Sequence, residues 1–249
     1  MEQSGHITLA AETIGHIFDI PVTNTLLVTW VSSVVLIVFA FASTRKMTLV
    51  PVSYLQGVAE VVIETGYNLI DDLAHGKVKT LLPILMTFFL YIITANWIGL
   101  LPGFGTIGFY GQEMGKETFV PLFRSINSDL NATLALALVS VVGTHIFAIK
   151  YLGLFGYIKK WFSFNPIMLF VGLLELFSEF TKIVSLSFRL FGNIFAGEAV
   201  LATISSLFAF VLPLPFYFLE IIVGFVQAAV FMMLTLVFIV LLTQKHDEA

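Results

Sequence analysis

One arginine stands inside a segment that is otherwise strongly apolar. Residues 185–198 read SLSFRLFGNIFAGE, which places Arg189 between a phenylalanine and a leucine. An arginine near the centre of a bilayer costs about 2.5–3.5 kcal/mol on insertion scales, so its presence indicates a function. No acidic residue stands three or four positions away, and Glu198 falls on the opposite side of a regular helix. We therefore expect the counter-ion to come from another helix or subunit; the alternative is a side chain that snorkels or binds backbone carbonyls.

Two glutamates flank the turn LPLP at residues 212–215. Glu198 precedes this turn and Glu220 follows it, so the two carboxylates can face each other if the flanking helices form a hairpin. Two carboxyl groups that share a site of low dielectric cannot both stay ionised, which is typical of a proton relay. The alternative is a pair of separately solvated glutamates near the outer interface.

Other polar residues recur at helical spacing along the same segment. Glu175, Lys182 and Arg189 are seven residues apart, and Asn193 follows four residues later. Ala196 continues this stripe, and its small side chain lets a neighbouring backbone come close. The stripe therefore predicts a polar contact face, although Glu175 and Lys182 could instead form an ion pair at the cytoplasmic end.

Three more polar residues stand in apolar surroundings. Gln227 comes seven residues after Glu220 and shares its helix face, whereas His145 and Asn96 are each alone in an apolar run. For His145 and Asn96, hydrogen-bonded packing between helices is the plain alternative to a place in an ion pathway.

Several classes of function find no support in the sequence. The chain has no cysteine, and its histidines lack the spacing of a metal site. The motifs GxSxG, HExxH, GxxxxGK[ST] and GxGxxG are absent, and no basic cluster indicates nucleic acid binding. Hydrolase and nucleotide-binding functions therefore find no support, and we expect no metal site, no cofactor and no nucleic acid partner.

The composition is that of a membrane protein. Hydrophobic residues make up 58% of the 249 residues and charged residues only 11%, with a mean hydropathy of +0.98. A soluble domain has about 25% charged residues, and a bilayer core about 30 Å thick needs runs of roughly 20 apolar residues. We expect an all-α polytopic membrane protein, with about five membrane-crossing helices and an amphipathic surface helix. The N-terminal segment lacks the basic start of a signal peptide, so we expect it to stay attached outside the membrane.

The whole chain, 1–249, reads as one membrane domain. Its expected parts are an outer segment 1–23, spans 24–43, 81–101 and 131–154, an amphipathic segment 47–80, and two long helices 167–212 and 216–243. The amphipathic segment has an apolar stripe at Val58, Val61, Val62, Thr65 and Leu69, which suits a membrane surface or a partner. The helix 167–212 would be about 69 Å long, more than twice the hydrocarbon thickness. It must therefore be tilted, broken at Gly192 or Gly197, or partly interfacial, and the two long helices are expected to form a tilted hairpin.

The positive charges predict the orientation of the chain. With five crossings, eight basic residues fall on one side: Arg45, Lys46, Lys77, Lys79, Lys150, Lys159, Lys160 and Lys245. Only Lys116 and Arg124 fall on the other side. Because basic loops stay in the cytoplasm, we expect an outer N-terminus and a cytoplasmic C-terminus. From the N-terminal extension without a targeting segment, we expect a bacterial plasma membrane.

Several segments together resemble subunit a of F-type ATP synthases. The match is most specific in SLSFRLFGNIFAGE, with FNPIMLFVGLLELFSEFTK ahead of it and a final helix that carries Glu220 and Gln227. The segments IPVTNTLL, NWIGLLPG and SDLNATLALAL also look like this family, so the resemblance covers nearly the whole chain.

The resemblance implies the stator half of a rotary motor that moves ions, protons on this interpretation, through two offset half-channels. It also implies a subunit that is not an enzyme, because ATP synthesis belongs to a catalytic head elsewhere in the complex. The implied partners are a ring of c subunits, the b subunits of the peripheral stalk, the rest of the complex, and lipid. Arg189 matches the essential arginine that faces a ring carboxylate and separates the half-channels. Asn193, Glu198, Glu220 and Gln227 match the outer half-channel, and Glu175 matches the inner one. The chain departs from the pattern of this family at two positions. It has a glutamate at 220, where many bacterial relatives have histidine, and a glycine at 99, where some have aspartate.

Two other functions are consistent with a charged helix in a membrane. A secondary transporter could use Arg189 to bind an anionic substrate, but it predicts internal repeats, and no duplicated pattern is visible. A purely structural assembly subunit predicts that Arg189 tolerates replacement by a neutral residue.

Overall fold

A computed structural model describes residues 11–17, 20–45, 47–48, 51, 53–101, 103–104, 107–113, 116–161, 166–207 and 211–244. Within these ranges the chain forms six α-helices: α1 (Asn24–Thr44), α2 (Tyr54–Leu73), α3 (Val78–Gly99), α4 (Leu130–Trp161), α5 (Pro166–Leu207) and α6 (Pro213–Thr243). The predicted all-α polytopic fold is confirmed. The expected outer segment 1–23 and the basic residues Lys46 and Lys245 lie wholly or partly outside the described residues.

Two small β-hairpins accompany the helices, and the sequence did not predict them. Strands β1 (Thr13–Ile17) and β2 (Ile20–Thr23) pair in antiparallel fashion just before α1. Strands β3 (Gly108–Glu113) and β4 (Lys116–Pro121) pair in the connection between α3 and α4. The strands are only four to six residues long, so each contains few apolar alternations by which a sequence could reveal it.

Four helices are long and apolar enough to cross a membrane, as judged from the described residues. They are α1, α3, α4 as far as Lys159, and α6. Helix α5 is longer than any of them, at 42 residues, but it carries Glu175, Glu179, Lys182, Arg189 and Glu198. The four apolar helices account for four of the about five predicted crossings. The fifth would have to be α5, which is long enough but carries these charged residues.

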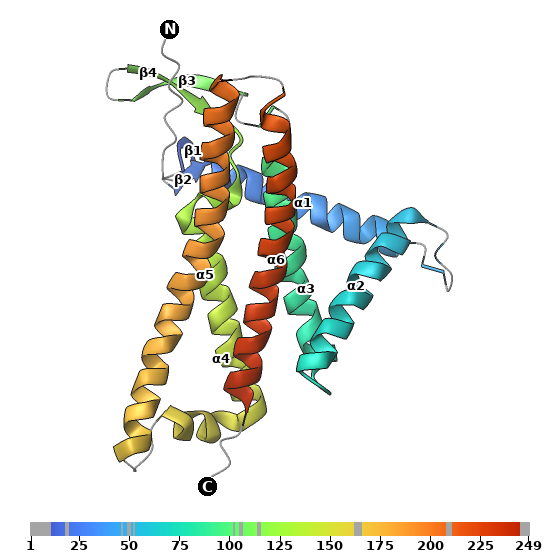
Figure 1. The fold of residues 1–249 in the computed structure, drawn as a ribbon, viewed down its shortest axis with the longest axis vertical. Helices are drawn as coiled ribbons and strands as arrows, with labels where there is room; N and C mark the ends of the chain where they lie inside the picture. Colours follow the sequence, from blue (N-terminus) through green and yellow to red (C-terminus); the bar gives the residue numbers. More distant parts are fainter. Residues whose placement is uncertain are drawn as a thin grey trace.

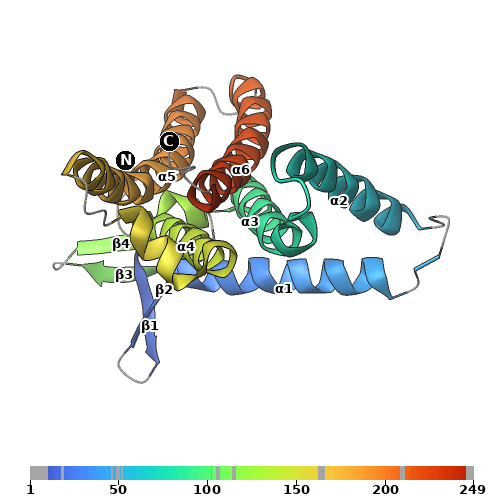
Figure 2. The ribbon, with the colours of Figure 1, turned by 90° about the horizontal axis from the view of Figure 1, so that it is seen from below.

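Helices α3, α4, α5 and α6 run along the length of the molecule, and α1 runs crosswise to them (Figures 1 and 2). Helix α2 returns from the far end of α1 to the start of α3. Helices α5 and α6 are antiparallel, with their connection at the end of the molecule opposite the C-terminus (Figure 1). Helix α5 packs mainly against α4, while α6 packs mainly against α3 and α4.

Helix α5 is continuous from Pro166 to Leu207. At 1.5 Å per residue its length is about 63 Å, still twice the hydrocarbon thickness. The alternative that this helix breaks at Gly192 or Gly197 is wrong, because both glycines lie inside the regular helix. Helix α4, by contrast, bends at Gly153, whose φ of 74° lies in the left-handed region that favours glycine. Beyond this bend its last turns run sideways beneath the bundle (Figure 1).

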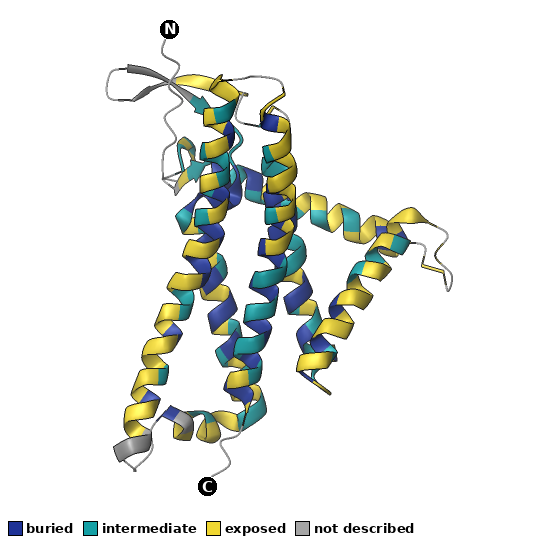
Figure 3. Cartoon of the chain, in the orientation of Figure 1, coloured by how far each residue is buried: buried dark blue, intermediate teal, exposed yellow. Residues whose placement is uncertain are grey.

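Two apolar clusters hold the helices together. One joins α2, α3 and α6 through Ile70, Leu81, Leu85, Leu236 and Ile239, together with their buried neighbours. The other joins α3, α4, α5 and α6 and includes Ile92, Val141, Leu186, Leu190 and Phe231. Leu190 belongs to this second cluster, whereas the adjacent Arg189 is exposed. Helix α5 is exposed over much of its N-terminal half (Figure 3).

Helix α2 packs through a different stripe from the apolar one that the sequence suggested. Gln56, Gly66 and Ile70 are its buried residues, and a Cβ at Gly66 would overlap the sulfur of Met86 on α3. Of the predicted stripe, Val62 packs against the core, whereas Val58, Val61, Thr65 and Leu69 are exposed.

Polar contacts fix the start of α4 against α1. Asp129 precedes α4, and its carboxylate accepts hydrogen bonds from the backbone N–H of Asn131 at 3.0 Å and from the hydroxyl of Thr25 at 3.0 Å. One side chain thus caps α4 and ties it to α1.

Candidate functional site

Arg189 lies on the exposed side of α5, next to a cleft between α5 and α6. The cleft has a volume of about 370 Å³, and Lys182, Ser185, Leu234 and Phe238 are among the residues that line it with Arg189. Within the part of the chain that the structure describes, no hydrogen bond or ion pair joins Arg189 to another residue. This full positive charge is therefore available to a group outside the chain.

A polar bridge joins α5 to α6 one turn beyond Arg189. The side-chain N–H of Asn193 donates to the side-chain oxygen of Gln227 at 2.8 Å. Gln227 is buried, while Asn193 is exposed on the same side of α5 as Arg189. Since the two residues are 34 positions apart, this bond fixes how the two helices are aligned along their length.

Glu220 reaches from α6 into the surface of α5. A Cβ added at Gly197 would overlap the carboxylate of Glu220, so only glycine leaves room for it. Glu220 is buried, and its Oε1 atom has no hydrogen-bond partner in the described chain. The carboxylate therefore lies beside Glu198, the residue after Gly197, close enough for the two groups to interact electrostatically.

Glu198 faces the short 3-10 turn η1 (Ile126–Ser128) that precedes α4. Its carboxylate lies within hydrogen-bonding reach of the Ser128 hydroxyl and in the field of Arg124. Arg124 also donates to the Ser128 hydroxyl at 3.2 Å and to the Ser128 carbonyl at 3.3 Å. Sequence reasoning counted Arg124 only as an outer charge and missed this contact, because nothing in the spacing brings η1 to α5.

Asn96 joins three elements at the same end of the bundle. Its side-chain N–H donates to the carbonyl of Gly224 on α6 at 3.0 Å, and its oxygen accepts from Asn127 in η1 at 2.6 Å. The side-chain oxygen of Asn127 and the hydroxyl of Ser125 are buried and have no partner in the described chain. Together with Oε1 of Glu220, they form a buried polar region of the kind that holds internal water.

Glu175 lies half-buried on α5, but it is not the partner of Lys182. The ammonium of Lys182 instead binds the carboxylate of Glu179 at 2.6 Å, and it lies 4.7 Å from the ring centre of Phe238. The suggested Glu175–Lys182 ion pair is therefore wrong. The reason is geometric, since side chains three positions apart on a helix are neighbours and those seven apart are two turns away.

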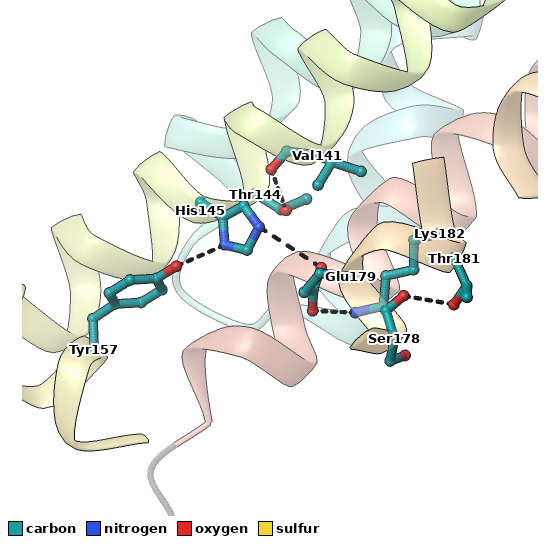
Figure 4. Close-up of polar contacts among 8 residues, drawn as sticks. All are labelled: Val141, Thr144, His145, Tyr157, Ser178, Glu179, Thr181 and Lys182. Carbon is teal, nitrogen blue, oxygen red and sulfur yellow. Dashed lines mark hydrogen bonds and ion pairs between the residues drawn. The ribbon is translucent and has the colours of Figure 1, made fainter. Parts of the chain in front are cut away.

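His145 connects α4 to this ion pair (Figure 4). Its Nδ1 atom lies 3.0 Å from the hydroxyl of Tyr157, and its Nε2 atom lies 3.8 Å from Oε2 of Glu179. The sequence analysis treated His145 as isolated and did not connect it with Tyr157 or Glu179. In the sequence, only the i, i+3 spacing of Glu179 and Lys182 indicated any of these contacts, namely the ion pair between those two residues.

The described residues contain no group of three or more histidine, cysteine, aspartate or glutamate side chains placed to hold a metal ion. The described polar residues instead form two regions at different positions along α5. One surrounds Glu198 and Glu220 near the α5–α6 connection, the other surrounds Glu179 nearer the C-terminal end, and Arg189 lies between them.

Comparisons with known proteins place the chain in a family. Residues 26–240 match the family model described as ATP synthase A chain. The protein named ATP synthase subunit a of Moorella thermoacetica is 31% identical over 233 residues, covering 94% of this chain and 96% of its own length. The protein of the same name from Gloeobacter violaceus is 34% identical over 230 residues, covering 90% of this chain and 85% of its own. ATP synthase subunit a 1 of Hahella chejuensis is 32% identical over 234 residues, covering 94% of this chain and 90% of its own length.

Proposed function

The chain belongs to the ATP synthase A chain family, and from this premise we propose that it is the ion-translocating stator subunit of an F-type ATP synthase. On this proposal, protons pass through two offset half-channels on either side of Arg189. Between the half-channels they ride on carboxylates of a rotating ring of c subunits. The chain forms and breaks no covalent bond of ATP, and synthesis takes place elsewhere in the complex.

This proposal rests mainly on the positive charge of Arg189, which has no ionic partner among the described residues. A buried or membrane-embedded cation without a counter-ion is costly, and the described chain offers Arg189 no carboxylate. A ring carboxylate that faces Arg189 would supply the missing charge. A fixed cation at this point would also prevent a proton from passing directly between the half-channels. Only neutral, protonated ring sites would then turn into the lipid.

The outer half-channel is assigned to the polar region near the α5–α6 connection. Its members on the two long helices are Asn193, Glu198, Glu220 and Gln227. Buried oxygens without a partner at Glu220 and Asn127 favour internal water there. Water and carboxylates together provide a path that accepts and releases protons.

The inner half-channel is assigned to the cleft beside Arg189 and to Glu175, farther along α5. Lys182 and Ser185 give this cleft a polar wall. Moving one charge across 100 mV supplies about 2.3 kcal/mol, so two separate access routes let the membrane potential act on each proton that the ring carries.

The family and the four apolar helices support an integral membrane location. Because α1 runs crosswise to α5 and α6 (Figure 2), these helices cannot all stand upright, and α5 is too long to do so. We therefore assign α1 an upright course and the α5–α6 hairpin a tilted one. The basic residues at the α2–α3 turn and along α4 favour a cytoplasmic side there, with the N-terminus outside.

A cysteine cross-link tests the predicted ring contact. The chain has no cysteine of its own, so a single replacement gives an unambiguous product. In the whole complex, Phe188→Cys, on the exposed side of α5 next to Arg189, is expected to cross-link to a cysteine placed beside the ring carboxylate. Val34→Cys on α1 is an equally exposed control and is expected to give no ring product. A product from Val34→Cys alone would mean that α1, and not α5, faces the ring.

A further inference from the structure

Four polar side chains form a connected row from α4 to the cleft beside Arg189 (Figure 4). The row runs from the hydroxyl of Tyr157 to Nδ1 of His145 over 3.0 Å, then from Nε2 of His145 to Oε2 of Glu179 over 3.8 Å. It ends where Oε1 of Glu179 binds the ammonium of Lys182 at 2.6 Å. Lys182 itself lines the cleft that contains Arg189.

The two ends of this row lie in different surroundings. Tyr157 belongs to the part of α4 beyond the bend at Gly153, at the end of the molecule where the chain terminates (Figure 1). Lys182 is seven residues before Arg189, which corresponds to about 10 Å along α5. The row therefore runs from the end of the bundle near Tyr157 to about 10 Å from the arginine along α5, and both Lys182 and Arg189 line the same cleft.

The buried member of the row is Glu179, whose side chain is 7% exposed. Its Oε1 atom is occupied by Lys182, whereas its Oε2 atom has no hydrogen-bond partner among the described residues and points at His145 (Figure 4). The nearby hydroxyls do not compete for it. Thr144 and Thr181 donate instead to carbonyls of their own helices, at 2.7 and 2.8 Å.

We propose that His145 and Glu179 carry protons between the inner side of the membrane and the Arg189 cleft, with Tyr157 and Lys182 as positioning residues. This inference rests on the proposed function and adds α4 to its inner half-channel. In the transfer step, the N–H bond at Nε2 of the imidazolium breaks and an O–H bond forms at Oε2 of Glu179. A neutral imidazole and a neutral carboxyl group result. The O–H bond at Oε2 of Glu179 then breaks as the proton passes through the Arg189 cleft to a ring carboxylate, which restores the Glu179 carboxylate, and the imidazole is protonated again from the inner aqueous phase.

The side chains in the row suit these roles. Imidazole can take up a proton on one nitrogen while the other keeps a hydrogen bond, here with the Tyr157 hydroxyl. Transfer requires the 3.8 Å gap to close to about 2.6–3.2 Å, which side-chain rotation can achieve and which resting geometries often leave open. Lys182 keeps the carboxylate in place through its 2.6 Å contact with Oε1.

Proton pumping driven by ATP, in vesicles that carry the whole complex, tests the inference. Glu179→Gln keeps the shape of the side chain but cannot exchange a proton, so the pumping rate is expected to fall at least about tenfold. Glu179→Asp keeps the carboxylate and is expected to retain part of the rate. Glu64→Gln on the exposed face of α2 is the matched control and is expected to pump at the parental rate. Parental pumping by Glu179→Gln would overturn the inference.

Chemical rescue separates a proton carrier from a packing residue at position 145. His145→Ala is expected to pump slowly and to recover part of its rate when imidazole is added, because free imidazole can occupy the space and carry the proton. His145→Gln keeps a hydrogen-bonding group for Tyr157 but cannot carry the proton, so it is expected to be slow as well. Parental pumping by His145→Gln, or an impaired His145→Ala on which imidazole has no effect, would overturn the role of His145.

The same vesicles distinguish this inference from the function on which it rests. Arg189→Ala is measured in parallel and is expected to abolish pumping. If Arg189→Ala pumps normally, the proposed function fails. If Arg189→Ala is inactive while the Glu179 and His145 variants pump normally, the proposed function stands and only the inner pathway through α4 fails.

Discussion

The carboxylate of Glu220 on α6 lies directly against the backbone of Gly197 on α5, in space that any larger residue at position 197 would fill. The contact joins the two long helices at the point where Glu198 follows in the chain. Because glycine has no side chain, the carboxylate can reach the backbone of the neighbouring helix. The position of Glu220, and with it the pairing of the two glutamates, therefore depends on a residue that has no chemistry of its own.

Replacing this glycine tests the contact. Gly197→Ala is expected to displace the Glu220 carboxylate and to reduce ATP-driven pumping at least about tenfold, as small displacements of catalytic groups do. Gly143→Ala on α4 is the matched control, because its Cβ would make only an ordinary contact at 3.8 Å with Ile84. Alanine favours helix more than glycine does, by about 0.5–1 kcal/mol, so neither variant should lose helix. Equal pumping by both variants would contradict the proposed role of Glu220.

The bond between Asn193 and Gln227 predicts that the two residues act as a unit. Asn193→Ala and Gln227→Ala are each expected to slow pumping, since each removes the 2.8 Å bond that aligns α5 with α6. The double variant is expected to be no slower than the worse single variant, because residues in one hydrogen-bond pair are not additive. Pumping rates for the four combinations measure this coupling. Strictly additive losses would mean that the two amides act separately.

The cap of α4 predicts a loss of stability without a change of the ion pathway. Asp129→Ala removes the acceptor for Asn131 and the partner of Thr25, which is expected to lower the free energy of unfolding by about 1–2 kcal/mol. Asp129→Asn keeps an acceptor oxygen and is expected to lose less. Thermal unfolding of the purified complex in detergent, followed by release of this chain, gives the comparison. A larger loss for Asp129→Asn than for Asp129→Ala would contradict the capping role.

Some of this arrangement follows directly from the sequence. Composition and apolar runs predict a helical membrane protein, because a bilayer leaves few other ways to pair the backbone groups. The turn at 212–215 predicts an antiparallel pair of long helices, and one glutamate on each side of that turn, Glu198 and Glu220, can then face each other. Both inferences use local periodicity, which a single sequence contains.

Other parts depend on contacts that periodicity does not encode. The contact between His145 and Glu179 requires a particular packing of α4 on α5, and Tyr157 reaches His145 only because α4 bends at Gly153. On α2, the buried stripe includes a glutamine and a glycine, because Gly66 lets the helix approach Met86 closely. A search for apolar side chains passes over both residues and selects the neighbouring stripe. The two β-hairpins were missed because strands of four to six residues are too short to establish an alternating pattern.

The most direct test of the central claim is ATP-driven proton pumping by the whole complex in vesicles, with Arg189→Ala compared with the unaltered chain. Arg45→Ala at the end of α1 controls for the loss of one positive charge, and ATP hydrolysis by the complex is measured in the same samples. The account predicts that Arg189→Ala abolishes pumping while the complex still hydrolyses ATP, and that Arg45→Ala pumps normally. A passive proton leak through Arg189→Ala would further support separation of two half-channels by this residue. Pumping by Arg189→Ala at the unaltered rate would contradict the account, because the open charge on α5 would then have no part in moving ions.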